Sequence, residues 1–255
     1  MRLIDFTKRY PYEEACKQAF KLQRERVGIK CKKCSGTSHY WISTREQYQC
    51  KQCSFRTTLR SGTLLENTKL SYYDWFLALH LLTSTKKGFS AKEIQRQMNK
   101  AYYEPVWRML HKIRAIMGTR DEEYKLSGLV EMDDAHFEVA YPADLDTKPG
   151  MGSEAKQKVL VMASSEEVVN QKKSKKLTRC KYFKMKTVDY ITQAMVGQVI
   201  DENVLSSSRV VTDGSNSFNH VGLHVKEHHA TVLKASEVSK VLPWVHTSIS
   251  NCKRT

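Results

Sequence analysis

The stretch VEMDDAHFEVAY, residues 130–141, has the apolar and aromatic side chains that are typical of a β-strand. Three acidic side chains nevertheless lie in the middle of it: Glu131, Asp133 and Asp134. A carboxylate loses its hydration when it is buried, so a buried strand carries such groups only where something positive compensates them. We therefore expect a charged site on this strand.

Strand-like segments continue on the C-terminal side of this stretch, and one of them also ends in an acid. We predict strands over 128–141, 157–164, 180–188, 208–213 and 221–226, a helix over 189–200 and the start of another over 242–255. Asp213 closes the fourth strand, before Gly214. If Asp133 and Asp213 lie on neighbouring strands, they can converge on a divalent cation such as Mg²⁺, which prefers carboxylate oxygen and supports phosphoryl transfer. The alternative is that each is a surface or turn aspartate.

The N-terminal half has the periodicity of helices instead. We predict helices over 10–27, 71–84, 90–99 and 104–117, of which the third opens with a capping box, Ser90 and Glu93. The last two helices form a helix-turn-helix candidate, because the second combines an apolar stripe with polar and basic side chains. The stripe consists of Val106, Met109, Leu110, Ile113, Ile116 and Met117. The candidate DNA-binding residues are Trp107, Arg108, His111, Lys112 and Arg114. The alternative is a plain helical hairpin between two domains.

Four cysteines form two C-x2-C pairs, Cys31 with Cys34 and Cys50 with Cys53. Two such pairs match a tetrahedral structural Zn²⁺ site, and the short segment between them is too small for a core of its own. Two disulfides are the alternative, but the chain has no recognisable secretory signal and three further cysteines, so zinc is favoured. Basic residues near the pairs point to a phosphate backbone as partner: Lys32, Lys33, Lys51, Arg56 and Arg60.

The net charge of the 255-residue chain is +15, and nearly all of the excess lies in residues 1–127. Such an asymmetry favours nucleic acid as the partner, although a basic surface that aids solubility would give the same count. No apolar run approaches the roughly 20 residues of a membrane helix. We therefore expect a soluble, cytoplasmic protein with no membrane partner.

Together these motifs resemble a known family: the insertion-sequence transposases that join a zinc ribbon, a helix-turn-helix and a ribonuclease-H-like catalytic domain of the DDE class. The resemblance runs from about residue 20 to the last residue. It rests on the cysteine pairs with the following SFRTTLRSGT, on GLVEMDDAHFEV, KPGMGSEAKQKVLVMASS and VVTDGSNSF, and on LPWVHTSISNCKR. It implies cleavage at the ends of a DNA element and strand transfer into target double-stranded DNA, with Mg²⁺ or Mn²⁺ as the catalytic metal and a homo-oligomer assembled on DNA.

The resemblance also assigns residues. Asp133 and Asp213 fall on the first two catalytic acids, and Asn251 falls on the third position, where many relatives carry Glu. An amide oxygen still ligates Mg²⁺ but brings no charge, so we expect weaker binding. Lys253 and Arg254 are candidate phosphate contacts, or simply a basic helix face. In relatives the last helix continues, so the ending at Thr255 suggests a truncated or frameshifted copy whose activity is in doubt.

The expected fold is α+β and multidomain. We predict an N-terminal helix over 1–27, a zinc ribbon over 28–63, a helix-turn-helix region over 64–120 and a ribonuclease-H-like domain with a mixed sheet over 128–255, incomplete at its C-terminus. Besides the transposase, two functions remain open. One is a catalytically inactive remnant or DNA-binding regulator, and the other is a structural-zinc protein whose ribbon binds protein partners.

Overall fold

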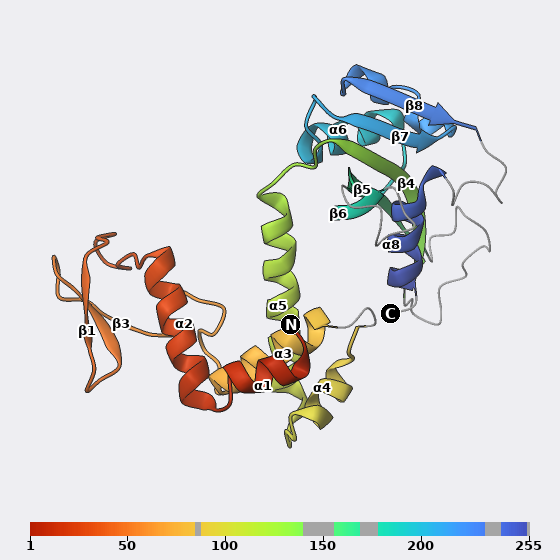
Figure 1. Cartoon of the computed structure of the whole chain (residues 1–255). Helices are drawn as coiled ribbons and strands as arrows, with labels where there is room; N and C mark the ends of the chain where they lie inside the picture. The colour runs from red at the N-terminus through yellow and green to blue at the C-terminus, as the bar shows by residue number, and fades with distance from the viewer. Residues whose placement is uncertain (85–87, 140–155, 169–177, 233–240, 254–255) are drawn as a thin grey trace, which may run out of the picture. The chain divides into compact units, whose positions relative to one another are not determined.

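The computed structural model describes residues 1–84, 88–139, 156–168, 178–232 and 241–253 (Figure 1). The chain divides into two compact units, Met1–Gly118 and Thr119–Thr255, which are described separately below. The described residues form helices, a three-stranded sheet and a five-stranded sheet, so the predicted α+β class is confirmed. No helix within these ranges is both long and apolar enough to cross a membrane.

The first unit combines helices with a small antiparallel sheet in the order β1-β2-β3 (Figure 1). Its elements are α1 (Leu3–Arg9), α2 (Glu13–Val27), β1 (His39–Ile42), β2 (Gln47–Cys50), β3 (Arg56–Thr58), α3 (Tyr72–Ser84), α4 (Ala91–Gln97) and α5 (Tyr103–Glu122), the last of which runs on into the second unit. The region 1–27, predicted as an N-terminal helix, forms two helices, α1 and α2, of which α2 corresponds to the periodicity found over 10–27.

One continuous apolar core joins the elements of this unit, from Cys16 of α2 through Tyr48 of β2 and Trp75 of α3 to α5. The predicted apolar stripe of α5 is buried over four positions: Val106, Met109, Leu110 and Ile113. The prediction is wrong for the last two positions of the stripe, since Ile116 and Met117 are each 49% exposed. The stripe therefore ends where the core of the first unit ends.

Helices α4 and α5 follow each other across a short turn, as predicted. The Ser90 hydroxyl accepts a hydrogen bond from the backbone N–H of Glu93 at 3.1 Å, so the predicted N-cap forms. Such a cap satisfies one of the helix's first backbone N–H groups, which have no partner inside the helix. Helix α4 is short and α5 is long, which leaves the face of α5 beyond the core open to solvent.

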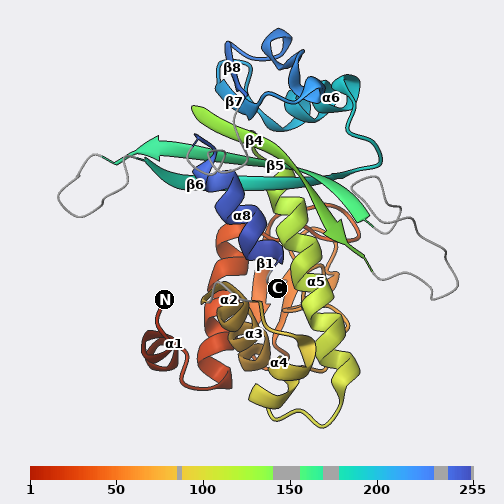
Figure 2. The same cartoon turned by 90° about the vertical axis from the view of Figure 1, so that its right-hand side faces the viewer.

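The second unit is built around a mixed sheet in the order β6-β5-β4-β7-β8 (Figures 1 and 2). Strands β6, β5 and β4 are antiparallel, whereas β7 and β8 run parallel to β4. This is the predicted ribonuclease-H-like mixed sheet. Its elements are β4 (Leu129–Glu138), β5 (Lys156–Glu167), β6 (Thr178–Val188), α6 (Gln193–Asn203), β7 (Arg209–Asp213), β8 (Glu227–Thr231) and α8 (Pro243–Lys253).

The prediction of a fifth strand over 221–226 is wrong. Val221–Leu223 forms a short 3-10 helix, and the edge strand is β8, Glu227–Thr231. Val221 and Val225 are buried at a helical spacing of four residues, while Leu223 between them is 80% exposed. Strand β8 is polar in sequence, so its place in the sheet depends on backbone pairing with β7 rather than on an apolar pattern.

Helices α6 and α8 cover opposite faces of this sheet (Figure 2). Val130 and Met132 of β4 pack with α6, whereas Ala135 of the same strand packs with Val245 and Ile249 of α8. Successive side chains of a strand point to opposite faces, so the odd-numbered residues of β4 face α8. This alternation decides which helix each acidic side chain of β4 meets.

Candidate active site and metal centres

Asp133 and Asp213 lie side by side on neighbouring parallel strands. Met132 of β4 is paired with Thr212 of β7, so Asp133 and Asp213 occupy the next position on each strand. Residues at matching positions of adjacent strands lie about 5 Å apart at the backbone and point to the same face. That face is the one covered by α8, because Asp133 alternates with Met132. The structure thus brings together two of the three predicted catalytic residues.

Each aspartate is oriented by a backbone donor. The N–H of Asp134 donates to Oδ1 of Asp133 at 2.9 Å, and the N–H of Ser215 donates to Oδ1 of Asp213 at 3.2 Å. Burial, followed by the negative charge of Asp213, raises the pKa of Asp133 to about 7. Burial also raises the pKa of Asp134, a shift that His136 opposes and Asp213 adds to. The site therefore concentrates negative charge in partly desolvated surroundings, which favours a bound cation.

Glu131, the third acid of the stretch, has a different partner. Its Oε2 accepts hydrogen bonds from the backbone N–H groups of Trp244 at 2.7 Å and Val245 at 3.0 Å. These are first-turn donors of α8, which lack partners inside the helix. Burial nevertheless raises the pKa of Glu131, against the opposing effect of the two N–H groups. The positive partner of this carboxylate is thus the N-terminus of α8.

His246 of α8 faces the aspartate pair. Its Nε2 lies 3.4 Å from Oδ2 of Asp133. Burial lowers the pKa of His246, and the charge of Asp213 acts in the opposite direction. Sequence reasoning assigned no role to His246 or Glu131. The available signal was their position: each lies on an element that also carries a predicted ligand.

A cavity of about 800 Å³ opens beside Asp133 and Asp134, and α8 closes one side of it with His246, Ile249, Cys252 and Lys253. Its lining also includes Lys156 of β5. Two lysines beside two aspartates suit a substrate that carries negative charge between bound cations. Lys253, a predicted phosphate contact, therefore lines the same cavity as the two aspartates. Arg254 lies outside the described residues.

Asn251, the third predicted catalytic residue, lies elsewhere on α8. It follows His246 by five residues, which at about 100° per residue places it roughly 140° away around the helix. Its side chain is exposed, and it is not among the described residues that line the cavity. The position that faces Asp133 on this helix is held by His246.

The model of the ISXO2-like transposase domain matches residues 125–255, which is half of the chain and the whole five-stranded sheet. The chain belongs to the ISXO2-like transposase family. A search of curated proteins found no match. Membership confirms the predicted family and makes the protein an insertion-sequence transposase that acts on DNA, so the sheet described above belongs to a DNA-recombining enzyme.

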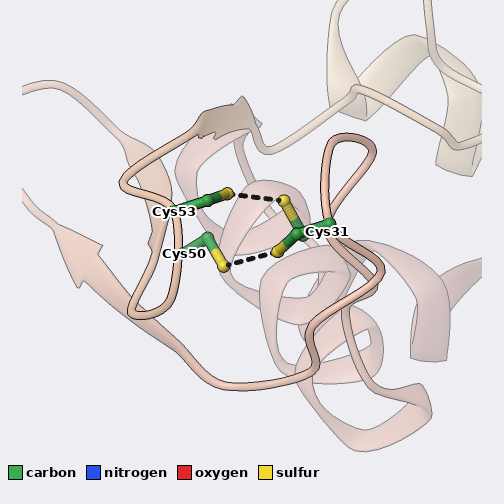
Figure 3. Close-up of side chains that lie close together, drawn as sticks. Cys31, Cys50 and Cys53 are labelled. Atoms are coloured by element: carbon green, nitrogen blue, oxygen red, sulfur yellow. Dashed lines mark hydrogen bonds between the residues drawn. The ribbon is translucent and has the colours of Figure 1, made fainter.

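In the N-terminal unit of the transposase, the four predicted cysteines lie together. Their Sγ atoms are all within 4.8 Å of one another, and the pairs Cys31–Cys53 and Cys34–Cys50 are each 3.5 Å apart (Figure 3). Four sulfurs around one Zn²⁺ at about 2.3 Å would lie about 3.8 Å apart, so the donor set and spacing fit. Hydrogen bonding, led by the backbone N–H of Cys34, lowers the pKa of Cys31 to about 6 and favours the thiolate that binds metal.

The basic residues around the cysteines differ in their availability to DNA. Lys33, Lys51 and Arg56 are exposed. Lys32 is exposed but pairs with Glu66 at 2.7 Å. Arg60 is turned inward: its guanidinium donates to the carbonyls of Thr68 and Leu70 and lies 4.3 Å from the ring centroid of Tyr72. Its contacts hold the chain between β3 and α3, a role the sequence did not indicate.

All five predicted DNA-binding residues of α5 are exposed. The rings of Trp107 and His111 are in contact, tilted by 47° with their centroids 4.0 Å apart, and Arg108 pairs with Glu104 at 2.6 Å. Lys112 donates to the carbonyl of Glu66 at 2.8 Å. Arg114 lies further along the exposed face of the helix. The transposase thus presents an aromatic and basic helix face outside its core.

Proposed function

We propose that this transposase cleaves DNA at the ends of an insertion sequence and joins them to target DNA by metal-dependent phosphoryl transfer, with Asp133 and Asp213 as ligands of Mg²⁺ or Mn²⁺. The observation that supports this assignment is the adjacent placement of the two carboxylates on one face of the sheet, with the pKa of Asp133 raised to about 7 by burial and by Asp213. Two such groups are stabilised together by a divalent cation.

The bound metal would activate a water or a DNA 3′-hydroxyl as nucleophile and stabilise the leaving oxygen. The chain's own residues prepare the site. The N–H groups of Asp134 and Ser215 fix the orientation of the two carboxylates. Glu131 anchors α8 beside them through the backbone of Trp244 and Val245. Lys253 and Lys156 would bind the phosphates that flank the reacting one.

The DNA-binding part of the proposal belongs to the first unit. We propose that residues 28–63 form a zinc ribbon and residues 64–120 a helix-turn-helix region, after an N-terminal helical segment over 1–27 and before the catalytic domain over 128–255. Four exposed basic side chains would contact DNA phosphates: Lys33, Lys51, Arg56 and Arg114. Trp107 would contact a base edge or insert between two stacked base pairs. A homo-oligomer on paired DNA ends completes the proposal.

The test uses the zinc-loaded full chain and a supercoiled plasmid that carries the genomic DNA flanking the coding sequence. We expect nicking and end cleavage with Mg²⁺ or Mn²⁺, reduced about 100-fold or more in Asp133→Asn and Asp213→Asn. Asp189→Asn is the matched control, because Asp189 is an exposed aspartate of the same unit. DNA binding, followed by gel shift, should persist in all three variants.

A second outcome would favour a different function. If the wild type and Asp133→Asn both fail to cleave and yet bind the flanking DNA, the chain acts as a DNA-binding regulator or inactive remnant. The single apolar core of the first unit, from α2 to α5, supports a DNA-binding module that holds together without the catalytic sheet.

A further inference from the structure

The ring of His246 is the feature of the catalytic unit that the proposed function leaves unexplained. Its Nε2 is inaccessible to solvent and has no hydrogen-bond partner among the described residues. The same atom lies 3.4 Å from Oδ2 of Asp133, which is outside good hydrogen-bond geometry. Buried polar nitrogens are paired in the great majority of cases, so this one calls for an explanation.

The surroundings of His246 limit the possible partners. Its backbone N–H is already used by the carbonyl of Leu242, and the helix that carries it is held to β4 by Glu131. The backbone that carries the ring is therefore held in place. Nε2 faces Oδ2 of Asp133, whose other oxygen, Oδ1, is engaged by the N–H of Asp134. In the tautomer whose Nε2 carries a lone pair, a cation is a group that can bind Nε2 and Oδ2 at once.

A divalent cation satisfies both atoms. Neighbouring donors around an octahedral cation at about 2.1 Å lie about 3.0 Å apart, so the observed 3.4 Å needs only a small adjustment. Imidazole nitrogen is an ordinary ligand for Mn²⁺ and other transition metals, whereas Mg²⁺ prefers oxygen. Within the described residues, Asp133, Asp213 and His246 do not have all their donor atoms within 4.8 Å of one another. Asp213 would have to approach, or act through a water molecule that the cation retains.

We propose that His246 is a direct ligand, through Nε2, of the divalent cation held by Asp133. This inference rests on the proposed function. It has one consequence of its own: a site with one nitrogen and carboxylate oxygens binds Mn²⁺ more tightly than Mg²⁺.

The test is electron spin echo envelope modulation on Mn²⁺ bound to the zinc-loaded full chain. A directly bound imidazole gives nitrogen modulation, and we expect this modulation in the wild type and its loss in His246→Gln. His136→Gln is the matched control. His136 lines the same cavity but pairs with Asp134, at 3.6 Å, so the modulation should remain. Asn251→Ala should also leave it unchanged.

A second measurement needs no substitution. Protein grown with ¹⁵N-labelled histidine should show the ¹⁵N frequencies in place of the ¹⁴N ones, whether or not His246→Gln folds. Mn²⁺ bound without any histidine modulation, or with modulation that persists in folded His246→Gln, overturns the inference and leaves the aspartate site standing. If Asp133→Asn does not weaken Mn²⁺ binding, the proposed metal site itself is wrong and the inference falls with it.

Discussion

Replacing Glu131 should release α8 from the sheet, and the structure gives the size of the effect. Glu131→Ala removes the acceptor of two N–H groups, that of Val245, which is buried, and that of Trp244, which is partly buried. Each buried donor left without a partner costs about 1–3 kcal/mol, so we expect α8 to lose about 2–6 kcal/mol of protection against local opening. Glu131 is 4% exposed, so water does not readily replace the lost oxygen.

Glu131→Gln separates the hydrogen bonds from the charge. Burial raises the pKa of Glu131 despite the two N–H donors, so the ionised form is less favourable in the folded protein than in the unfolded chain. A neutral amide keeps an acceptor oxygen without that desolvation cost. We therefore expect Glu131→Gln to change the protection of α8 by no more than about 1 kcal/mol.

Hydrogen exchange followed by mass spectrometry measures the free energy of local opening of α8. A local measurement is needed because a chain with two units is not expected to unfold in one transition. Peptides that cover residues 243–253 should exchange about 30-fold or more faster in Glu131→Ala. Peptides of α3 serve as the internal control: Glu13 binds the N–H groups of Tyr72 and Tyr73 in the same way and is untouched. Equal exchange of α8 in wild type and Glu131→Ala would refute the anchoring role.

Three further predictions follow from other contacts. Removal of Zn²⁺ by a chelator, or Cys31→Ser, should unfold residues 28–63, because this segment has little core of its own. The measurement is hydrogen exchange, in which peptides from residues 28–63 should lose their protection. Glu66 has its pKa lowered to about 2, first by Lys32 and then by the N–H of Gly62, so its stabilising effect is present above pH 4.5 and is lost as the pH falls toward 2. Glu66→Gln should abolish that acid-side loss of stability in a denaturation series, and an unchanged pH profile would contradict it. Arg114→Ala should weaken DNA binding at all sequences and reduce the slope of log affinity against log salt by about one, as measured by fluorescence anisotropy; an unchanged slope would exclude a phosphate contact.

Strong local patterns made much of this protein predictable. The cysteine spacing, the N-cap at Ser90 and the apolar stripe of α5 each depend on residues close in sequence, and the structure contains all three, apart from the last turn of the stripe. Of the predicted capping box, the structure shows the Ser90 half, whereas the carboxylate of Glu93 binds Arg96 and Gln97. The adjacency of Asp133 and Asp213 was expected from two acids on strand-like segments, and the family resemblance assigned the same two residues.

Prediction from the sequence failed where the role of a residue depends on a partner that is distant in the chain. Glu131 has the same local setting as Asp133, yet it binds a helix that begins more than 100 residues later. Arg60 looked like a phosphate ligand and instead binds three neighbouring groups of its own unit. Strand β8 carries no apolar alternation, so only its pairing with β7 identifies it.

The alternation of side chains along β4 places a structural contact and a proposed catalytic group on the same face of the sheet. Glu131 and Asp133 are two residues apart, so one strand face carries both the anchor of α8 and the carboxylate that His246 of that helix approaches. A single residue inserted between Met132 and Asp133 would keep the anchor where it is and rotate Asp133 into the apolar layer beneath α6. A one-residue insertion at this point therefore separates the anchor from the proposed metal-binding carboxylate unless a β-bulge absorbs it.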